Sequence, residues 1–125
     1  MRARQPHPSV IRWFRSVPGN DLYLSSITIF ELELGTLQAE RRDPPKGTAL
    51  RTWLERHVLP TFFERILSID TEVARRCAGL HLPETRSERD AFIAATALVH
   101  SMTVVTRNTA DFAATGVPTL NPWQA

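Results

Sequence analysis

Short apolar stretches alternate with longer stretches of helical spacing along this chain of 125 residues. The apolar stretches, bounded by turn-forming or charged residues, are predicted to be strands over 21–27, 65–70, 103–106 and 117–121. The segments between them place apolar residues three and four positions apart, which predicts helices. Because strands that alternate with helices form βαβ units, the sequence predicts an α/β fold with a parallel sheet.

The predicted helices cover 8–17, 28–42, 48–63, 71–82 and 87–102, with a short helical turn over 108–116. The proline-rich stretch 43–47 is expected to separate the second helix from the third, and Pro60 to end or bend the third. Thr71 is expected to cap the fourth helix. Pro118 favours an edge position for the last strand, because proline has no N–H for a ladder hydrogen bond.

The composition excludes several classes of protein. Hydrophobic residues make up 42% and charged residues 22%, as in globular proteins, and the length suits one domain over 1–125. Cys77 is the only cysteine, so it forms no internal disulfide and is expected to be a small buried apolar group. No apolar run approaches the roughly 18 residues of a membrane span, and no signal core follows the N-terminus, so we expect a cytoplasmic protein without a membrane partner.

The basic residues are nearly all arginine. The formal net charge is +2, and Lys46 is the only lysine among the 15 basic residues. Arginine suits bidentate contacts to phosphate. A GC-rich genome would supply the same bias without any function, so both explanations stay open.

Three acids stand three positions after a residue that can cap a helix, in the pairs Thr28 and Glu31, Ser87 and Asp90, and Asn108 and Asp111. Each pair fits a capping pattern, which is a sufficient structural explanation for any one of them. A functional explanation comes from position, because Glu31 and Asp111 follow predicted strands and parallel sheets bind ligands beyond the carboxyl ends of strands. Asp90 begins a helix that precedes a strand, so periodicity alone does not place it beside the other two.

The chain contains, in order, the segments "LYLSSITIFELELG", "RILSID", "SERDAFIAATALVHSMTVVTRNTADF" and "LNPW". Together they resemble PIN-domain ribonucleases, and most closely the VapC/FitB-type toxins of bacterial type II toxin–antitoxin systems. The resemblance runs from about residue 8 to Trp123. It implies one PIN-like domain, a three-layer α/β/α arrangement around a parallel sheet.

The resemblance also implies a metal site and an activity. The acids of the family motifs, implied to be catalytic and to hold Mg²⁺ or Mn²⁺, are Glu31, Asp90 and Asp111. The implied polar neighbours are Thr28, Thr106 and Asn108. Oxygen ligands suit these ions, and a cation relieves the repulsion among clustered carboxylates. The implied function is metal-dependent endoribonucleolytic hydrolysis of RNA, with a cognate antitoxin and a second copy of the chain as partners.

The start of the chain departs from the family pattern. Family members normally begin with a strand that ends in a sequence such as "LDTN", which supplies the first acid and the central strand of the sheet. This chain begins with "MRARQPHPSV", so we expect a sheet that lacks the usual first central strand. Either the start is misassigned or truncated, or the short chain is the real one, and the first explanation is favoured because a parallel sheet tolerates such a loss poorly.

Two other functions are weighed against the nuclease. A PIN-like shell without its first strand could be catalytically inactive and act as a module that binds antitoxin or RNA. A flavodoxin-like phosphoacceptor domain would need an acidic pair after its first strand and a lysine late in the chain. Lys46 is the only lysine and lies in the first half, so this function is set aside.

Overall fold

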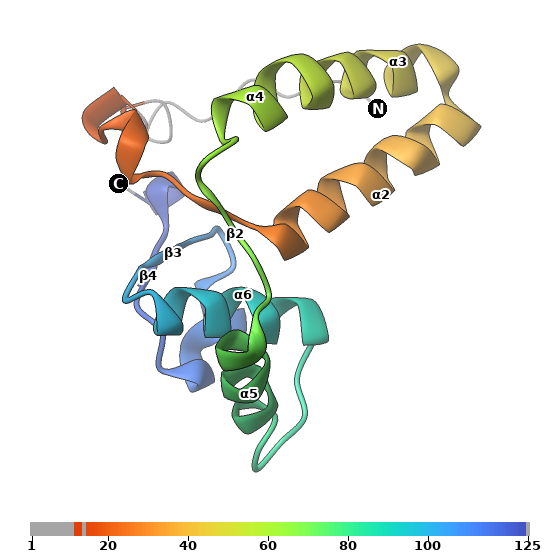
Figure 1. Ribbon diagram of the computed structural model, residues 1–125. Helices are drawn as coiled ribbons and strands as arrows, with labels where there is room; N and C mark the ends of the chain where they lie inside the picture. Colours follow the sequence, from red (N-terminus) through yellow and green to blue (C-terminus); the bar gives the residue numbers. More distant parts are fainter. Residues whose placement is uncertain (1–11, 14, 125) are drawn as a thin grey trace.

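The computed structural model describes residues 12–13 and 15–124. Figure 1 shows a helical arm above a second helical half, with short strands near their junction. The helices are α2 (Ser26–Arg42), α3 (Pro44–Trp53) and α4 (Leu59–Thr61) in the arm, and α5 (Thr71–Leu80) and α6 (Glu88–Val99) in the other half. The strands are β1 (Leu24–Ser25), β2 (Ile66–Leu67), β3 (Val104–Val105) and β4 (Thr119–Leu120). Short 3₁₀ helices cover Gly19–Asp21, Thr109–Thr115 and Pro122–Gln124.

The strands form two parallel pairs. β1 pairs with β2, with Leu24 opposite Ile66, and β3 pairs with β4, with Val104 opposite Thr119. The predicted α/β class and parallel direction are therefore confirmed, although each strand is shorter than predicted. Within the described residues no strand joins β1 to β3, so the sheet is split in two, as expected for a sheet without its first central strand.

The first predicted helix is described only in part. Of residues 8–17, the residues 12–13 and 15–16 are helical, whereas 8–11 and 14 lie outside the described residues. Among the described residues, no helix combines the length and the apolar character that crossing a bilayer requires.

α2 begins at Ser26 rather than at the predicted Thr28. Ser25 ends β1 in an extended conformation, and its Oγ accepts a hydrogen bond of 3.1 Å from the Ile27 N–H. This earlier serine caps the helix, so the predicted capping pair of Thr28 and Glu31 is wrong. The carboxylate of Glu31 consequently lies outside the cap.

The predicted break over 43–47 is shorter in the structure, where only Asp43 lies between α2 and α3. Pro44 and Pro45 take the first helical positions, which tolerate proline because their N–H groups need no partner inside the helix. Asp43 Oδ1 accepts a hydrogen bond of 3.4 Å from the Lys46 N–H and caps this start.

Two further boundaries test the sequence predictions. A π-helical turn over Leu54–Val58 precedes Pro60, and the helix ends soon after it, so the predicted end or bend is confirmed. Asp70 rather than Thr71 caps α5, because Asp70 Oδ1 accepts a backbone N–H at 2.9 Å. The prediction for Thr71 is therefore wrong by one residue.

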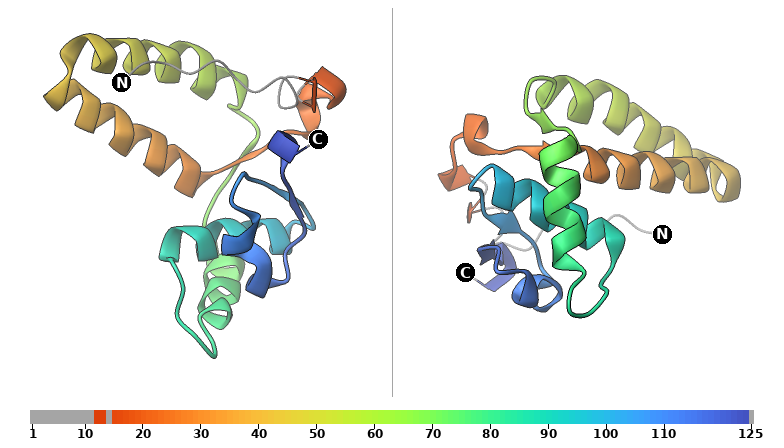
Figure 2. Two further views of the ribbon diagram at one scale, coloured as in Figure 1. Left: turned by 180° about the vertical axis from the view of Figure 1, so that it is seen from behind. Right: turned by 60° about the horizontal axis from the view of Figure 1, so that its bottom comes forward.

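α6 packs through small side chains on two neighbours. One core cluster contains Ala94, Ala97, Val104, Phe112 and Val117, and joins α6 to the C-terminal segment that Figure 2 shows against it. The other cluster contains Ala91, Ala95, Val73 and Cys77, and joins α6 to α5. Cys77 is 3% exposed and burial raises the pKa of its thiol, so the prediction of a small buried apolar group is confirmed.

α2 and α3 approach each other closely in the arm. Gly47 is buried at their contact, and a Cβ placed on it would lie 2.4 Å from the Cα of Glu40. A backbone atom cannot move aside as the end of a side chain can. The helices therefore reach this distance only because residue 47 has no side chain.

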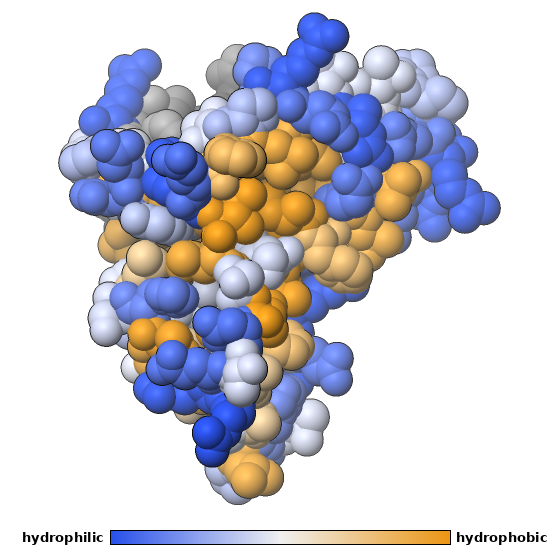
Figure 3. Space-filling model, viewed as in Figure 1, coloured by the Kyte–Doolittle hydropathy of each residue, from blue (hydrophilic) through white to orange (hydrophobic). Residues whose placement is uncertain are grey.

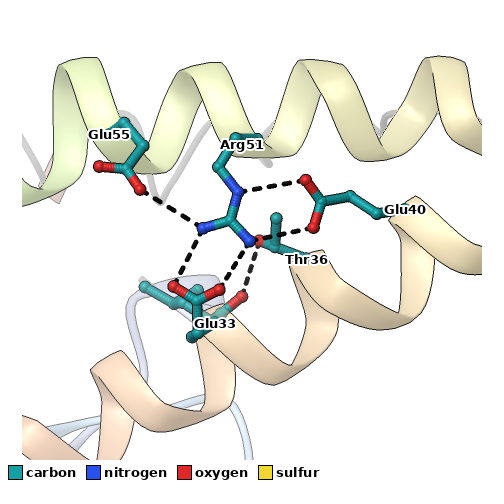
Figure 4. A network of polar contacts seen from close by, with 6 residues as sticks. Glu33, Thr36, Glu40, Arg51 and Glu55 are labelled. Carbon is teal, nitrogen blue, oxygen red and sulfur yellow. Dashed lines mark hydrogen bonds and ion pairs between the residues drawn. The ribbon is translucent and has the colours of Figure 1, made fainter.

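Arg51 links the same two helices through charged hydrogen bonds (Figure 4). Its guanidinium donates to Glu33 at 2.6 and 3.0 Å and to Glu40 at 3.0 and 3.2 Å, and it also reaches Glu55 at 3.4 Å. The hydrogen bonds from Arg51 lower the pKa of Glu33 and of Glu40, and both carboxylates raise the pKa of Arg51. These side chains are partly exposed, so the network orients the arm more than it stabilises it.

Gly47→Ala is expected to destabilise the protein by about 1–3 kcal/mol, the usual cost of overpacking a close contact. The matched control is Gly35→Ala, because nothing lies within 4 Å of a Cβ at this position of α2. Alanine is favoured over glycine in a helix by roughly 0.8–1.0 kcal/mol, so the control should be neutral or stabilising. Urea unfolding followed by circular dichroism measures both, and equal effects would contradict the close approach.

Arg51→Met should lower the melting temperature near neutral pH, because Glu33 and Glu40 lose their partner. Their pKa values are lowered in the folded state, so this stabilisation is present above the ordinary carboxyl value of 4.5 and is lost as the pH falls through the folded values. The difference from wild type should shrink when thermal unfolding is measured at about pH 3 instead of about pH 7. Arg56→Met, at an exposed position next along the same run of helix, is the control. A difference that persists undiminished in acid would exclude the ionic contribution.

Candidate active site

The start of α2, which follows β1, and the carboxyl end of β3 border one hollow of about 240 Å³. Its wall includes the predicted acids and their predicted polar neighbours, which are Thr28, Glu31, Asp90, Thr106, Asn108 and Asp111. Apolar side chains complete the wall, namely Ile93, Val104, Val105 and Phe112. Residues from distant parts of the sequence thus meet at one edge of the split sheet, where parallel sheets usually bind ligands.

Each acid is positioned by an element next to a strand. Glu31 lies on α2, which starts at the end of β1, and Asp111 lies in the 3₁₀ helix that follows β3. Asp90 lies in the first turn of α6, where its N–H donates to Ser87 Oγ at 3.5 Å, so the predicted cap by Ser87 is confirmed. The loop before α6 therefore brings Asp90 to the edge that the other two acids occupy, which periodicity alone did not establish.

The loop after β3 is held by its own polar groups. Thr106 Oγ1 accepts a hydrogen bond of 3.0 Å from the Asn108 N–H, and the Asp111 N–H donates to the Asn108 carbonyl at 3.1 Å. Asn108 makes no side-chain capping bond, so the predicted cap at this residue is wrong. Asn108 lines the hollow, and its side-chain amide makes no capping hydrogen bond to the start of the helix.

Asp90 and Asp111 interact electrostatically. Burial raises the pKa of the Asp90 carboxyl, and the negative charge of Asp111 raises it further. Two carboxylates that repel each other resist full ionisation unless a positive charge is supplied. The pair is therefore a place where a cation would be stabilised.

A positive charge already lies beside the third acid. Arg89 Nη1 is 3.9 Å from Glu31 Oε2, and the Arg89 guanidinium lies 4.9 Å from the centre of the Phe30 ring. The ion pair is weak, since the two side chains are 48% and 39% exposed. The sequence patterns described above do not point to Arg89. One signal is present in the sequence, because Arg89 is a cation in the first turn of a helix, where the helix dipole disfavours positive charge.

The side-chain oxygen atoms that line the hollow suit a hard divalent cation. Three carboxylates, two threonine hydroxyls and one amide offer the oxygen atoms that Mg²⁺ and Mn²⁺ prefer. Among the described residues, however, no group of three or more His, Cys, Asp or Glu side chains is arranged to hold an ion as it stands. The hollow has the chemistry of a cation site without a preformed cluster of ligands.

Comparison with known proteins assigns the chain to a family. Residues 2–117 match the family model described as PIN domain. The chain belongs to the PIN-domain family. This PIN chain is 42% identical to Toxin FitB of Neisseria gonorrhoeae (strain ATCC 700825 / FA 1090) over 125 residues, which cover 95% of the chain and 88% of FitB.

Two further comparisons agree with this assignment. The PIN chain is 34% identical to VapC ribonuclease Y4jK of Sinorhizobium fredii (strain NBRC 101917 / NGR234) over 125 residues, which cover 96% of the chain and 88% of Y4jK. It superposes on the crystal structure of FitAcB from Neisseria gonorrhoeae with a TM-score of 0.89 and 38% identity, covering 98% of the chain and 91% of the matched chain. The predicted resemblance to PIN-domain toxins of the VapC/FitB type is confirmed.

Asp111→Asn should lower the pKa of Asp90 toward the ordinary aspartate value without reaching it, because the repulsion disappears while the burial remains. Titration of the Asp90 carboxyl carbon by NMR, in the absence of divalent ions, measures the shift. Glu84→Gln, at an exposed loop position, is the control and should leave it unchanged. An Asp90 pKa that is the same in the Asp111 variant and in wild type would mean that the two carboxylates do not interact.

Proposed function

We propose that this protein is a metal-dependent endoribonuclease and the toxin of a toxin–antitoxin pair. The proposal is carried by one observation, the hollow that Glu31, Asp90 and Asp111 line together in a PIN-domain chain. It is supported by two relatives, which are named Toxin FitB and VapC ribonuclease Y4jK. The proposed substrate is RNA and the proposed reaction is hydrolysis of its phosphodiester bonds.

The proposed cofactor is Mg²⁺ or Mn²⁺, held by the three acids. Thr28, Thr106 and Asn108 would lie beside it as polar neighbours. When bound, such an ion polarises a phosphodiester and lowers the pKa of the water that attacks phosphorus. Asp90 must be ionised to serve as a ligand, so cation affinity should fall as the pH drops through its raised pKa.

The remaining residues of the hollow have two proposed tasks. Its wall contains no His, Cys or Ser to act as a nucleophile. The attacking nucleophile is therefore water, and the acids position this water and the cation. Arg89 does not line the hollow itself but is an exposed cation 3.9 Å from Glu31, and arginine commonly contacts nucleic-acid phosphate. We assign it to an RNA phosphate, which it would contact once Glu31 has turned to the cation.

The proposed protein partners are a cognate antitoxin and a second copy of the chain, in the cytoplasm. Apolar side chains exposed on the arm support such contacts, because Phe30, Leu37 and Trp53 are 50%, 48% and 46% exposed. Figure 3 shows hydrophobic surface gathered at the arm and at its junction with the other half. A hollow of about 490 Å³ between α2 and α3 adds a concave surface there.

A binding module without catalysis is the second candidate. It is favoured by the absence, among the described residues, of a preformed group of three metal ligands, and by the pairing of Glu31 with Arg89. Cleavage assays of the 125-residue chain with and without Mn²⁺ separate the two functions. The nuclease cuts RNA only with the ion, whereas the module binds RNA or antitoxin and cuts in neither condition.

Asp90→Asn should abolish Mg²⁺-dependent RNA cleavage while leaving the protein folded. The loss of activity should exceed roughly 10–100-fold, which is the usual loss when a residue that only hydrogen-bonds to a metal ligand is removed. Cleavage of a labelled RNA is compared with the melting temperature of each variant, and Glu72→Gln, at an exposed position on α5, serves as the control. A folded Asp90 variant that cuts at the wild-type rate would falsify the assignment of this acid.

A further inference from the structure

An aromatic ring and a guanidinium lie together beside the hollow that the acids line. The central carbon of the Arg89 guanidinium is 4.9 Å from the centre of the Phe30 ring, and Nη1 of the same group is 3.9 Å from Glu31 Oε2. Phe30 directly precedes Glu31 on α2, and Arg89 directly precedes Asp90 on α6. Because one guanidinium contacts both Phe30 and Glu31, the ring lies within the breadth of a single side chain from the edge of the hollow.

The packing of the chain leaves this ring largely uncovered. Phe30 is 50% exposed although Arg89 lies over it, and neither core cluster contains it. The buried residues of α2 are Thr36 and Ala39, in the second half of the helix. Aromatic rings and arginine guanidinium planes are the surfaces on which proteins stack the unpaired bases of RNA. Phe30 therefore offers a base a surface that the fold itself does not use.

Arg89 sets this ring apart from other aromatic residues. Two more arginines lie over aromatic rings in the described part of the chain. Of the ion pairs between described residues, however, only that of Arg89 and Glu31 includes an acid of the hollow. Arg89 is thus placed to offset the charge of an RNA phosphate next to the carboxylates.

We propose that Phe30 stacks on an unpaired base of the RNA, next to the phosphodiester that is cut, while Arg89 contacts a phosphate of the same strand. The inference rests on the proposed function for its ligand, RNA, and adds the residue that receives a base. Stacking accepts every base because each has a π-face. Phe30 therefore requires that a base be present, without selecting which base it is.

The charges around Phe30 favour RNA over a protein as the molecule that covers this ring. An apolar protein contact would bury the Arg89 charge, and Arg89 would lose its only partner once Glu31 has turned to the cation. A nucleotide supplies both a π-face for the ring and a phosphate for the guanidinium. Among the described residues no arginine lies over Leu37 or Trp53, so this argument does not extend to the other exposed apolar side chains of the arm.

The test measures the affinity of the full chain for fluorescein-labelled oligoadenylate RNA by fluorescence anisotropy, without divalent ions so that nothing is cut. Phe30→Ala should weaken binding roughly 5–150-fold, the usual effect of losing one base–aromatic stack. Phe30→Trp keeps an aromatic face and should bind like wild type. The matched control is Phe63→Ala, at a residue that is 78% exposed and is not among the described residues that line the hollow. It should leave the affinity unchanged.

An RNA of the same length that carries no bases separates stacking from charge. Phe30→Ala should leave the affinity for this RNA nearly unchanged, because the phosphates remain and only the base is missing. Arg89→Met should weaken binding of both RNAs and reduce the slope of log affinity against log salt by about 0.7, the contribution of one phosphate contact in a single strand. Phe30→Ala should not change that slope. A Phe30 effect of equal size on both RNAs would overturn the stacking.

NMR locates the base on the protein. The ring protons of Phe30 should shift upfield when oligoadenylate is added, because an adenine stacked on them contributes its ring current, whereas those of Phe63 should not shift. No shift at Phe30 in the RNA-saturated protein would overturn the stacking. Circular dichroism checks that the variants fold. Should Phe30→Ala unfold, the ring shifts and Phe30→Trp decide the inference without it.

The outcomes distinguish this inference from the proposed function. RNA affinity that is unchanged in Phe30→Ala would overturn the stacking alone, and a changed oligomeric state of that variant would then assign Phe30 to a protein contact. A wild-type chain that binds RNA through Phe30 but cuts none with Mn²⁺ would overturn the nuclease and preserve the stacking. A wild-type chain that binds no RNA would overturn both.

Discussion

The packing of α6 through alanine is the interaction on which the rest of the structure depends. Ala91 and Ala95 let α5 approach one face of the helix, while Ala94 and Ala97 let the C-terminal segment approach another. Small side chains allow backbones to come close at the density of a protein interior. Since Asp90 stands in the first turn of this helix, the packing of α6 holds Asp90 where the preceding loop has brought it.

The three acids belong to different halves of the molecule. Glu31 lies on the arm, whereas Asp90 and Asp111 lie on α6 and on the 3₁₀ helix after β3. Their shared hollow therefore depends on how the arm is held, and Arg51 and Gly47 set the geometry within that arm. A cation bound by all three acids would link the arm to the rest of the fold as well as supply chemistry.

The sequence predicts the parts of the fold that local physics determines. The alternation of strands and helices, the parallel direction, the cap at Ser87 and the burial of Cys77 follow from spacing and residue type. Helix starts are missed wherever a neighbouring residue competes for the same role, as Ser25 does with Thr28.

The candidate site is predicted less completely than the fold. Strand ends account for Glu31 and Asp111, but Asp90 needed the family resemblance, because the course of the loop before α6 is not encoded in periodicity. Arg89 was missed since its partners, Glu31 and Phe30, are distant in the sequence and meet it only in the folded chain. The split of the sheet likewise was expected from the family resemblance and not from periodicity, and the strand pairing of the described residues agrees with it.

The lone thiol between α5 and α6 gives the molecule an internal reporter. Cys77 is the single cysteine of the chain, and its burial keeps the thiolate scarce and out of reach of reagents. An alkylating reagent can react with it only when the two helices part, so the labelling rate follows the opening of this contact, by local or by global unfolding. The same contact supports the start of α6, so that rate would also register how often the scaffold beneath Asp90 comes apart.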